Sequence, residues 1–118
     1  MNPRIVSLAE MVQPENSAPA QDRLIAGDPR QQIWNHFTDA TGQFFAGRCS
    51  STRGTWHVRY TENELCVLTA GRVVITSDAG ERTEFGPGSA FIVPAGFSGS
   101  WEVVEPCTKI YAVFETRT

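Results

Sequence analysis

Glycine and proline divide the chain into short segments, and beyond the first 31 residues no window of eleven or more shows the apolar spacing of a helix. The segments are instead rich in β-branched and aromatic residues. Val, Ile, Thr, Phe, Tyr and Trp number 39, whereas Leu, Met and Lys together number seven. The first group suits a pleated, half-buried surface and the second favours helix. This bias predicts an all-β fold.

Nine short strands are expected between turns. They are predicted at residues 33–38, 43–50, 55–61, 65–68, 72–77, 82–85, 90–93, 99–104 and 108–115. Turn residues separate them, among them Asp78-Ala79-Gly80 and the pair Ala70-Gly71. Nine strands in about 85 residues fit a sandwich, a barrel or a jelly roll.

Residues 1–31 differ from the rest of the chain, because four prolines and a polar, turn-like segment interrupt them. This composition predicts an N-terminal arm, extended or with one short helical turn near residues 7–11, in front of a single domain at 32–118. The arm still contains apolar side chains such as Ile5 and Leu8, which are costly to leave in water. We therefore expect it to lie along the domain or along a neighbouring subunit.

Charge and cysteine content restrict the environment and the partners. The net charge of −3 and a pI near 5.3 leave no basic surface to neutralise phosphates, so neither nucleic acid nor a membrane is expected as a partner. Cys49, Cys66 and Cys107 are odd in number and widely spaced, which predicts buried thiols in a reducing compartment. Because the sequence also shows no secretory signal and no apolar run of about 18 residues, we expect a cytoplasmic protein.

Two segments carry a spacing that is specific when both occur in this order. Six residues separate Glu64 from Gly71, and five separate Gly88 from Pro94-Ala95-Gly96. The two glycines allow tight turns, and the Pro-x-Gly sequence makes a sharp bend before the next strand. The pair resembles the two conserved motifs of the cupin family. This resemblance implies a single-domain cupin jelly-roll β-barrel.

A narrower resemblance rests on three further segments. Trp56-x-Val58-x-Tyr60, the run from Pro94 to Val103, and Lys109-Ile110-Tyr111 are similar to the small single-domain cupins grouped with (S)-ureidoglycine aminohydrolase. The similarity covers about residues 33–115 and leaves the arm outside. It implies either an enzyme acting on a ureido- or amino-acid-like substrate, or a related barrel with another role.

The chain departs from the cupin pattern at the metal ligands. Metal-binding cupins carry His-x-His before the acid and a third His after Pro-x-Gly. Here the paired positions fall on Val58 and Tyr60, or, with a gap one residue longer, on His57 and Arg59. The third position is Gly99. The histidines that hold a metal in such cupins are therefore not reproduced.

Alternation along the strand distinguishes the two registers. Trp56, Val58 and Tyr60 are apolar or aromatic and belong on the core face, which turns His57 outward and places Tyr60 in the lumen near Glu64. A divalent transition metal needs three or four ligands, and one carboxylate does not hold it. We expect no metal site and no cofactor.

The candidate site residues each have two interpretations. Glu64 is either a buried carboxylate that anchors a ligand, hydrogen-bonded to Tyr60, or an acid that starts a turn. Lys109, the only lysine in the chain, either supplies a compact ammonium or occurs there by chance, and the sequence leaves open whether it faces inward. Cys66 is expected to pack as a small hydrophobe.

The aromatic candidates complete a predicted ligand pocket in the lumen. Trp56, Trp101 and Tyr111 belong either to the core or to a platform for a ligand. The predicted pocket comprises Trp56, Tyr60, Glu64, Trp101, Lys109 and Tyr111. We expect it to bind a small polar or amine-bearing metabolite, with an aminohydrolase-like enzyme as the alternative. Exposed sheet edges and the apolar arm predict a homodimer.

Overall fold

A computed structural model of the chain describes residues 3–117. Within that range the structure consists of strands and one short 3-10 helix, η1, with no α-helix, which confirms the all-β prediction. None of its helical segments is long and apolar enough to cross a bilayer. In chain order the elements are β1 (Glu15–Ser17), η1 (Gln21–Arg23), β2 (Leu24–Gly27), β3 (Gln31–Thr38), β4 (Phe44–Ser51), β5 (Gly54–Arg59), β6 (Asn63–Ser77), β7 (Arg82–Phe85), β8 (Ala90–Val93) and β9 (Ser98–Phe114).

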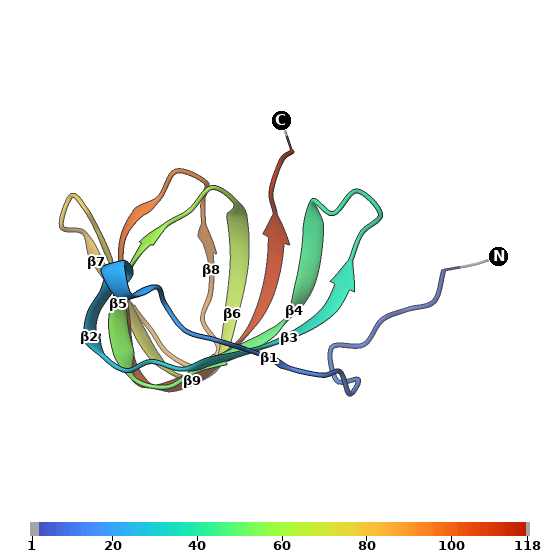
Figure 1. Ribbon diagram of the computed structural model, residues 1–118, viewed down its shortest axis with the longest axis horizontal. Helices are drawn as coiled ribbons and strands as arrows, with labels where there is room; N and C mark the ends of the chain where they lie inside the picture. Colours follow the sequence, from blue (N-terminus) through green and yellow to red (C-terminus); the bar gives the residue numbers. More distant parts are fainter. Residues whose placement is uncertain (1–2, 118) are drawn as a thin grey trace.

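Two long strands, β6 and β9, belong to both sheets of the barrel. One half of each takes part in a first sheet with the order β1-β3-β4-β9-β6-β8. The other half takes part in a second sheet with the order β2-β5-β9-β6-β7. All neighbours are antiparallel, and the sheets curl around a common interior (Figure 1). The predicted jelly-roll barrel is thereby confirmed.

The predicted turn at Ala70-Gly71 is wrong, because β6 runs through this pair. Between Leu68 and Val73 the pairing of β6 with β9 shifts register, as at a β-bulge. Gly71 has a φ of 85°, and a Cβ there would collide with the carbonyl oxygen of Pro106. The glycine thus serves a close approach of two backbones where both strands pass from one sheet to the other.

The remaining strand predictions agree with the structure once this bend is taken into account. Residues 65–68 and 72–77 are two halves of β6, and residues 99–104 and 108–115 correspond to β9, which ends at Phe114. The predicted turn after β6 is confirmed, since the Gly80 amide donates to the Ser77 carbonyl at 2.8 Å.

The N-terminal arm adds one short strand to each sheet. β1 pairs with β3, and β2 pairs with β5, so the arm lies along the barrel (Figure 1). Further towards the N-terminus, the Glu10 amide donates to the Ser7 carbonyl at 3.2 Å and closes a single turn. Ile5 and Met11 are 90% and 98% exposed. The arm is therefore ordered against the barrel while some of its apolar side chains remain uncovered.

The core lies between the two sheets and confirms the register predicted for β5. Trp56, Val58 and Tyr60 pack against the buried cluster, whereas His57 points to the outside, with its Nε2 3.4 Å from Asp78 Oδ1. The buried cluster consists of Cys66, Leu68, Val73, Ile75, Val93, Trp101, Val103 and Cys107. Cys66 packs there as predicted.

Candidate functional site

Three polar side chains meet inside the barrel, two from neighbouring positions in the sequence, Tyr60 and Glu64, and one from β9, Lys109. Glu64, near the start of β6, is 7% exposed. One of its carboxylate oxygens accepts a hydrogen bond from the Tyr60 hydroxyl at 2.8 Å, and the other accepts one from the Lys109 ammonium at 2.8 Å. The hydrogen bond expected between Tyr60 and Glu64 is confirmed, and Lys109 completes a buried ion pair.

The Pro-x-Gly bend holds Tyr60 in position. Tyr60 directly follows β5, and its backbone N–H donates to the Phe97 carbonyl at 2.9 Å. Its own carbonyl accepts from the Gly96 amide at 2.8 Å, and Gly96 has a φ of 94° that favours glycine. The Tyr60 ring also meets Phe97 edge-on, with centroids 6.4 Å apart. The bend predicted from Pro94-Ala95-Gly96 therefore fixes the donor to Glu64.

Strand pairing brings Lys109 to the same place. In β9, Lys109 lies directly opposite Leu68 of β6 on one side and Cys49 of β4 on the other. Directly paired residues share a face of the sheet, so Lys109 projects to the side of the fully buried Leu68. Glu64 lies on the same face, four residues before Leu68. Lys109 and Tyr111 thus both turn inward, the register that the sequence left open.

Burial and proximity determine the charge state of this cluster. Burial by itself would lower the pKa of Lys109, but attraction to Glu64 and smaller contributions from Cys66, Tyr60 and Cys49 together outweigh burial and hold that pKa well above its usual value. Burial, together with Glu64, also raises the pKa of Tyr60. At neutral pH Lys109 is therefore an ammonium and Tyr60 a neutral phenol that donates its proton in a hydrogen bond.

An aromatic ring and a thiol surround the rest of the ammonium. Lys109 Nζ lies 4.6 Å from the centroid of the Trp101 ring, within the range of a cation–π interaction. Trp101 is directly opposite Trp56 of β5 in the register of the second sheet. The Cys66 Sγ is 3.7 Å from Nζ, and burial raises the pKa of Cys66 to about 12, so the thiol keeps its proton.

Tyr111 shares this face but bonds elsewhere. Its hydroxyl donates to Asn35 Oδ1 at 2.8 Å, and its ring meets Phe45 edge-on at 6.4 Å. Burial raises the pKa of Tyr111 to about 12. Tyr111 therefore forms part of the wall next to Lys109 rather than part of the hydrogen-bonded cluster around Glu64.

Two cavities are lined by both Lys109 and Cys49. One has a volume of about 140 Å³ and includes Trp56 and Trp101 in its wall. The other has a volume of about 180 Å³ and includes Glu64 and Tyr111. Five of the six predicted pocket residues thus line one of the two cavities. The sixth, Tyr60, lines neither and acts through its hydrogen bond to Glu64.

Sequence reasoning missed several residues of the cavity walls. Ile33, Phe45 and Cys49 come from β3 and β4 and line the larger of the two cavities. Alternation along each strand would put them on one face. Only the pairing of β4 with β9, 60 residues later in the chain, brings Cys49 next to Lys109. That long-range register has no local signature in the sequence.

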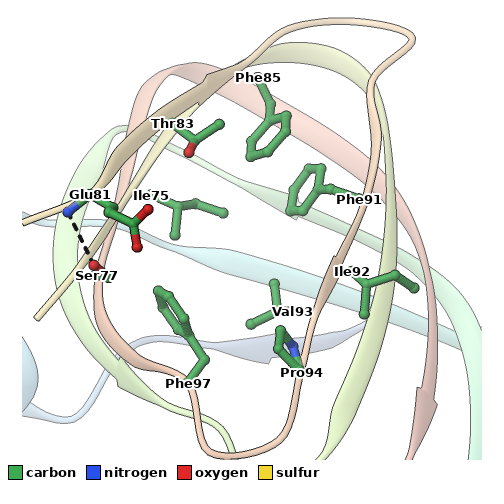
Figure 2. Close-up of a pocket in the computed structure, with 10 residues that line it drawn as sticks. All are labelled: Ile75, Ser77, Glu81, Thr83, Phe85, Phe91, Ile92, Val93, Pro94 and Phe97. Atoms are coloured by element: carbon green, nitrogen blue, oxygen red, sulfur yellow. Dashed lines mark hydrogen bonds between the residues drawn. The ribbon is translucent and has the colours of Figure 1, made fainter. Parts of the chain in front are cut away.

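A third cavity, of about 200 Å³, lies in the part of the barrel bounded by β7 and β8. Each of these strands pairs only with β6. Figure 2 shows Phe85, Phe91 and Phe97 around the cavity, with Glu81 at one side. The rings of Phe85 and Phe91 stack with centroids 3.9 Å apart. None of the predicted pocket residues lines this cavity.

The positions that correspond to metal ligands in other cupins are occupied differently here. Val58 packs into the core and His57 lies outside it. A Cβ at Gly99 would collide with the carbonyl oxygen of Thr76, so a histidine does not fit there without a backbone shift. In the described part of the chain, no group of three or more His, Cys, Asp or Glu could hold a metal ion. The polar side chains that meet at this site are those of Lys109, Glu64 and Tyr60.

Comparison with known proteins identifies a family. The family model of the EutQ-like cupin domain matches residues 38–111. No curated protein gives a significant match. A Pseudomonas syringae pv. tomato protein of unknown function superposes with a TM-score of 0.81 at 25% identity, over 92% of this chain and 46% of that one. The present chain therefore spans about half the length of that protein.

More distant structures share the fold. The EutQ protein of Clostridium difficile superposes with a TM-score of 0.66 at 19% identity, over 84% of this chain and 80% of that one. A predicted oxalate decarboxylase of Thermotoga maritima superposes with a TM-score of 0.72 at 13% identity, over 96% and 100%. At these identities the likeness concerns the fold alone. The narrower resemblance to the (S)-ureidoglycine aminohydrolase group stays a prediction.

Proposed function

The chain belongs to the family of EutQ-like cupin domains, and we propose that it binds a small polar metabolite next to Lys109 in the lumen of the barrel. The observation that carries the proposal is the cluster of Tyr60, Glu64 and Lys109 beside two cavities. Buried polar groups among apolar walls are the usual composition of small-molecule sites. The clustering of perturbed ionisable groups supports the same interpretation.

The contacts of Glu64 favour one class of metabolite. An amine-bearing ligand would need a negatively charged acceptor, but each oxygen of Glu64 already accepts a hydrogen bond and the Lys109 ammonium neutralises its charge. A carbonyl or carboxylate oxygen would instead accept from the Lys109 ammonium, which lines both cavities. The size of the larger cavity, about 180 Å³, suits a ligand of a few carbon atoms. We therefore favour a small oxo- or carboxylate-bearing metabolite over an amine.

Binding can be tested by calorimetry with two matched sets of compounds, short carboxylates and 2-oxo acids on one side and short alkylamines on the other. Lys109→Met should abolish binding of the first set, because it removes the ammonium. If Glu64 anchors an amine instead, the same substitution would strengthen binding of the second set by freeing a carboxylate oxygen. Glu84→Gln, which alters an exposed ion pair on another strand, serves as the control and should leave binding unchanged.

An enzyme acting on a ureido- or amino-acid-like substrate is the second candidate. Its support is that Lys109, Glu64 and Tyr60 together could accept and return a proton at a substrate in the lumen. Ammonia release from ureidoglycine and related compounds tests this activity directly. Turnover that survives in Lys109→Met and Glu64→Gln would assign the activity to another part of the chain or to a contaminant.

We further propose that two copies of the chain pair through the outer face of the first sheet. Leu65 alternates with the inward residues of β6 and is 40% exposed. Its direct partners are Ile92 of β8, which is 61% exposed, and Ala112 of β9. On the far side of β9, Ala112 pairs with Ala46 of β4, and Ala46 pairs with Phe37 of β3. An apolar row thus crosses five strands on the outside of the barrel. Phe44 and Phe114, a second directly paired and exposed couple, extend it.

The size of this outer face is consistent with a dimer that also uses the arm. Five strands spaced about 4.8 Å apart, with two or three outward residues each, give a face of roughly 400 Å². That is within the range of large apolar patches that mark interaction sites, but below the roughly 800 Å² per partner of a stable dimer. The exposed Ile5 and Met11 of the arm provide additional apolar area to cover a partner.

Light scattering at tens of micromolar protein tests the pairing. We expect a dimer mass for the unmodified chain and a monomer mass for Leu65→Glu with Ile92→Glu. Val104→Glu is the matched control, because Val104 is 38% exposed and lies outside the apolar row. A monomer mass for the unmodified chain, or a dimer that persists in the double variant, would contradict the proposal.

A further inference from the structure

We propose that Lys109 forms a covalent imine with a small aldehyde or ketone that enters the lumen. The inference rests on the proposed metabolite site and names a reaction for it. Lys109 is the only lysine among 118 residues, in a chain that uses arginine for all nine of its other basic side chains. Arginine forms the better ion pair with a carboxylate, but it does not lose its proton in proteins, whereas a lysine amine can become a nucleophile.

The ion pair provides an acceptor for the proton that the amine must lose. Lys109 Nζ lies 2.8 Å from Glu64 Oε2, so a proton can pass directly between them, while the Tyr60 hydroxyl holds the other oxygen. The transfer converts an ammonium and a carboxylate into a neutral amine and a neutral acid. A ligand that expels water from the cavities removes solvation from both charges and thereby favours the neutral pair. Ligand binding would thus convert Lys109 into the neutral amine that acts as the nucleophile.

The reaction balances with the groups that are present. The neutral Lys109 amine attacks the carbonyl carbon and forms a C–N bond, the C=O π bond breaks, and the oxygen takes up the proton that the attacking Nζ loses, which gives a neutral hydroxyl. Protonated Glu64 then returns its proton to that hydroxyl, the C–O bond breaks, and water leaves. The product is an iminium between the ligand carbon and Nζ, formed without an oxidant, a reductant or any other reactant.

The surroundings favour this product. The Glu64 carboxylate, restored at the end of the sequence, lies at hydrogen-bond distance from the positive iminium, and the Trp101 ring lies 4.6 Å from Nζ. The nearest competing nucleophile is Cys66, at 3.7 Å from Nζ. Burial raises the pKa of Cys66 to about 12, so at neutral pH it stays a thiol and does not compete.

The cavity next to Nζ has room for a carbonyl compound. The cavity of about 180 Å³ has Lys109 and Glu64 in its wall, and its other lining residues are mainly apolar or aromatic. If each heavy atom takes roughly the 30 Å³ of a water molecule, the cavity accepts a carbonyl compound of up to about six heavy atoms. Short aldehydes and short 2-oxo acids fall within this limit.

The experiment uses sodium cyanoborohydride, which reduces an imine to a stable secondary amine, with propanal and pyruvate as probes. Because arginine does not react, peptide mass mapping has to distinguish only Lys109 from the amine at the start of the chain. We expect the adduct at Lys109 in the folded protein, and no adduct there for Lys109→Arg. Glu64→Gln should slow labelling about 10²-fold, because it removes the acid that returns a proton to the hydroxyl, even though it also removes a carboxylate that raises the pKa of Lys109. Tyr60→Phe should slow it less.

Folding of each variant is checked by circular dichroism. If Glu64→Gln does not fold, Glu64→Asp replaces it in the test. Because Glu64→Asp keeps a carboxylate, it should retain part of the labelling. Labelling confined to the N-terminal amine would overturn the inference. So would labelling of Lys109 at the same rate in folded protein and in urea. If calorimetry shows that carboxylates bind while no probe labels Lys109, the imine is refuted and the proposed binding function stands. If neither is seen, both fail.

Discussion

Two ion pairs with the same separation occur in different surroundings. Lys109 and Glu64 approach to 2.8 Å inside the barrel, with side chains 14% and 9% exposed. Arg72 and Glu84 also approach to 2.8 Å, between β6 and β7 at the surface, with side chains 43% and 40% exposed. Their geometry alone would not distinguish them. The solvent around them does, because water screens the exposed pair and hydrates each partner when the other is removed.

The comparison shows why only one of the pairs is a candidate site. Removal of Glu84 leaves Arg72 in water, which solvates it at little cost. Removal of Glu64 leaves Lys109 enclosed by Trp101 and Cys66, where no solvent replaces the carboxylate. A buried pair contributes little net stability compared with an apolar core, but it supplies charge and a proton acceptor in an enclosed space. Breaking the interior pair therefore costs more free energy than breaking the exposed pair, and only the interior pair offers a ligand a charge and a proton acceptor in the lumen.

The largest effect is expected from breaking the buried pair on one side. Lys109→Met removes the ammonium and leaves Glu64 without a cation, which should lower the free energy of unfolding by about 3–5 kcal/mol at pH 7. Urea denaturation followed by fluorescence of the tryptophans measures this value. The double variant with Glu64→Gln should recover a large part of the loss, because it removes both charges. A single-variant loss below about 1 kcal/mol would mean that water reaches Glu64.

A smaller effect is expected from removing the neutral donor to the same carboxylate. Tyr60→Phe keeps the ring and its packing against Phe97 but deletes the hydrogen bond to Glu64. Hydrogen bonds to charged groups contribute about 1.5–3 kcal/mol, so a loss in this range is expected. Tyr111→Phe is the matched control, since it deletes an equally short bond to the neutral Asn35 amide and should cost about 1 kcal/mol. Equal losses of unfolding free energy in the two variants would contradict a stronger hydrogen bond at the charged Glu64 than at the neutral Asn35.

Much of this site could be predicted from the sequence, because several of its residues are close together in the chain. Trp56, Val58 and Tyr60 alternate in one short strand, and the bend at Pro94-Ala95-Gly96 follows from the chemistry of proline and glycine. Local patterns of this kind predicted the inward register of Tyr60 and its hydrogen bond to Glu64, both of which the structure contains.

The other half of the site depends on pairings between distant strands. Lys109 reaches Glu64 only because β9 pairs with both β4 and β6, and no local pattern states which residues become partners. The turn predicted at Ala70-Gly71 failed for a related reason. A glycine with positive φ serves a tight turn and a bulge equally well, and the approach of Pro106 decides between them.

The contribution of the buried pair to stability should decrease at alkaline pH. The pKa of Lys109 is higher in the folded chain than in the unfolded chain, so its contribution to stability is complete below about pH 10.5 and is lost as the pH rises through the folded value. Tyr60 and Tyr111, whose pKa values burial also raises, add a decline of the same sign. The stability difference between the unmodified chain and Lys109→Met isolates the lysine. It should stay constant from pH 7 to about pH 10 and shrink above that, by at most about 1.4 kcal/mol per pH unit. A difference that shrinks below pH 9 would indicate a lysine without its raised pKa.

The smallest effect is expected at the exposed pair. Glu84→Gln removes the carboxylate that accepts from both Nε and a terminal nitrogen of Arg72, at 3.0 and 2.8 Å. Because both side chains are about two-fifths exposed, water solvates the freed guanidinium, and the free energy of unfolding should fall by no more than about 1 kcal/mol. This small loss should also decrease at 1 M salt, where the screening length is about 3 Å, whereas the loss in Lys109→Met should change much less, since salt screens buried pairs much less than exposed ones. Urea denaturation of both variants at low and high salt measures the contrast. A salt-insensitive loss at Glu84 above about 2 kcal/mol would show that solvent exposure does not separate the two pairs.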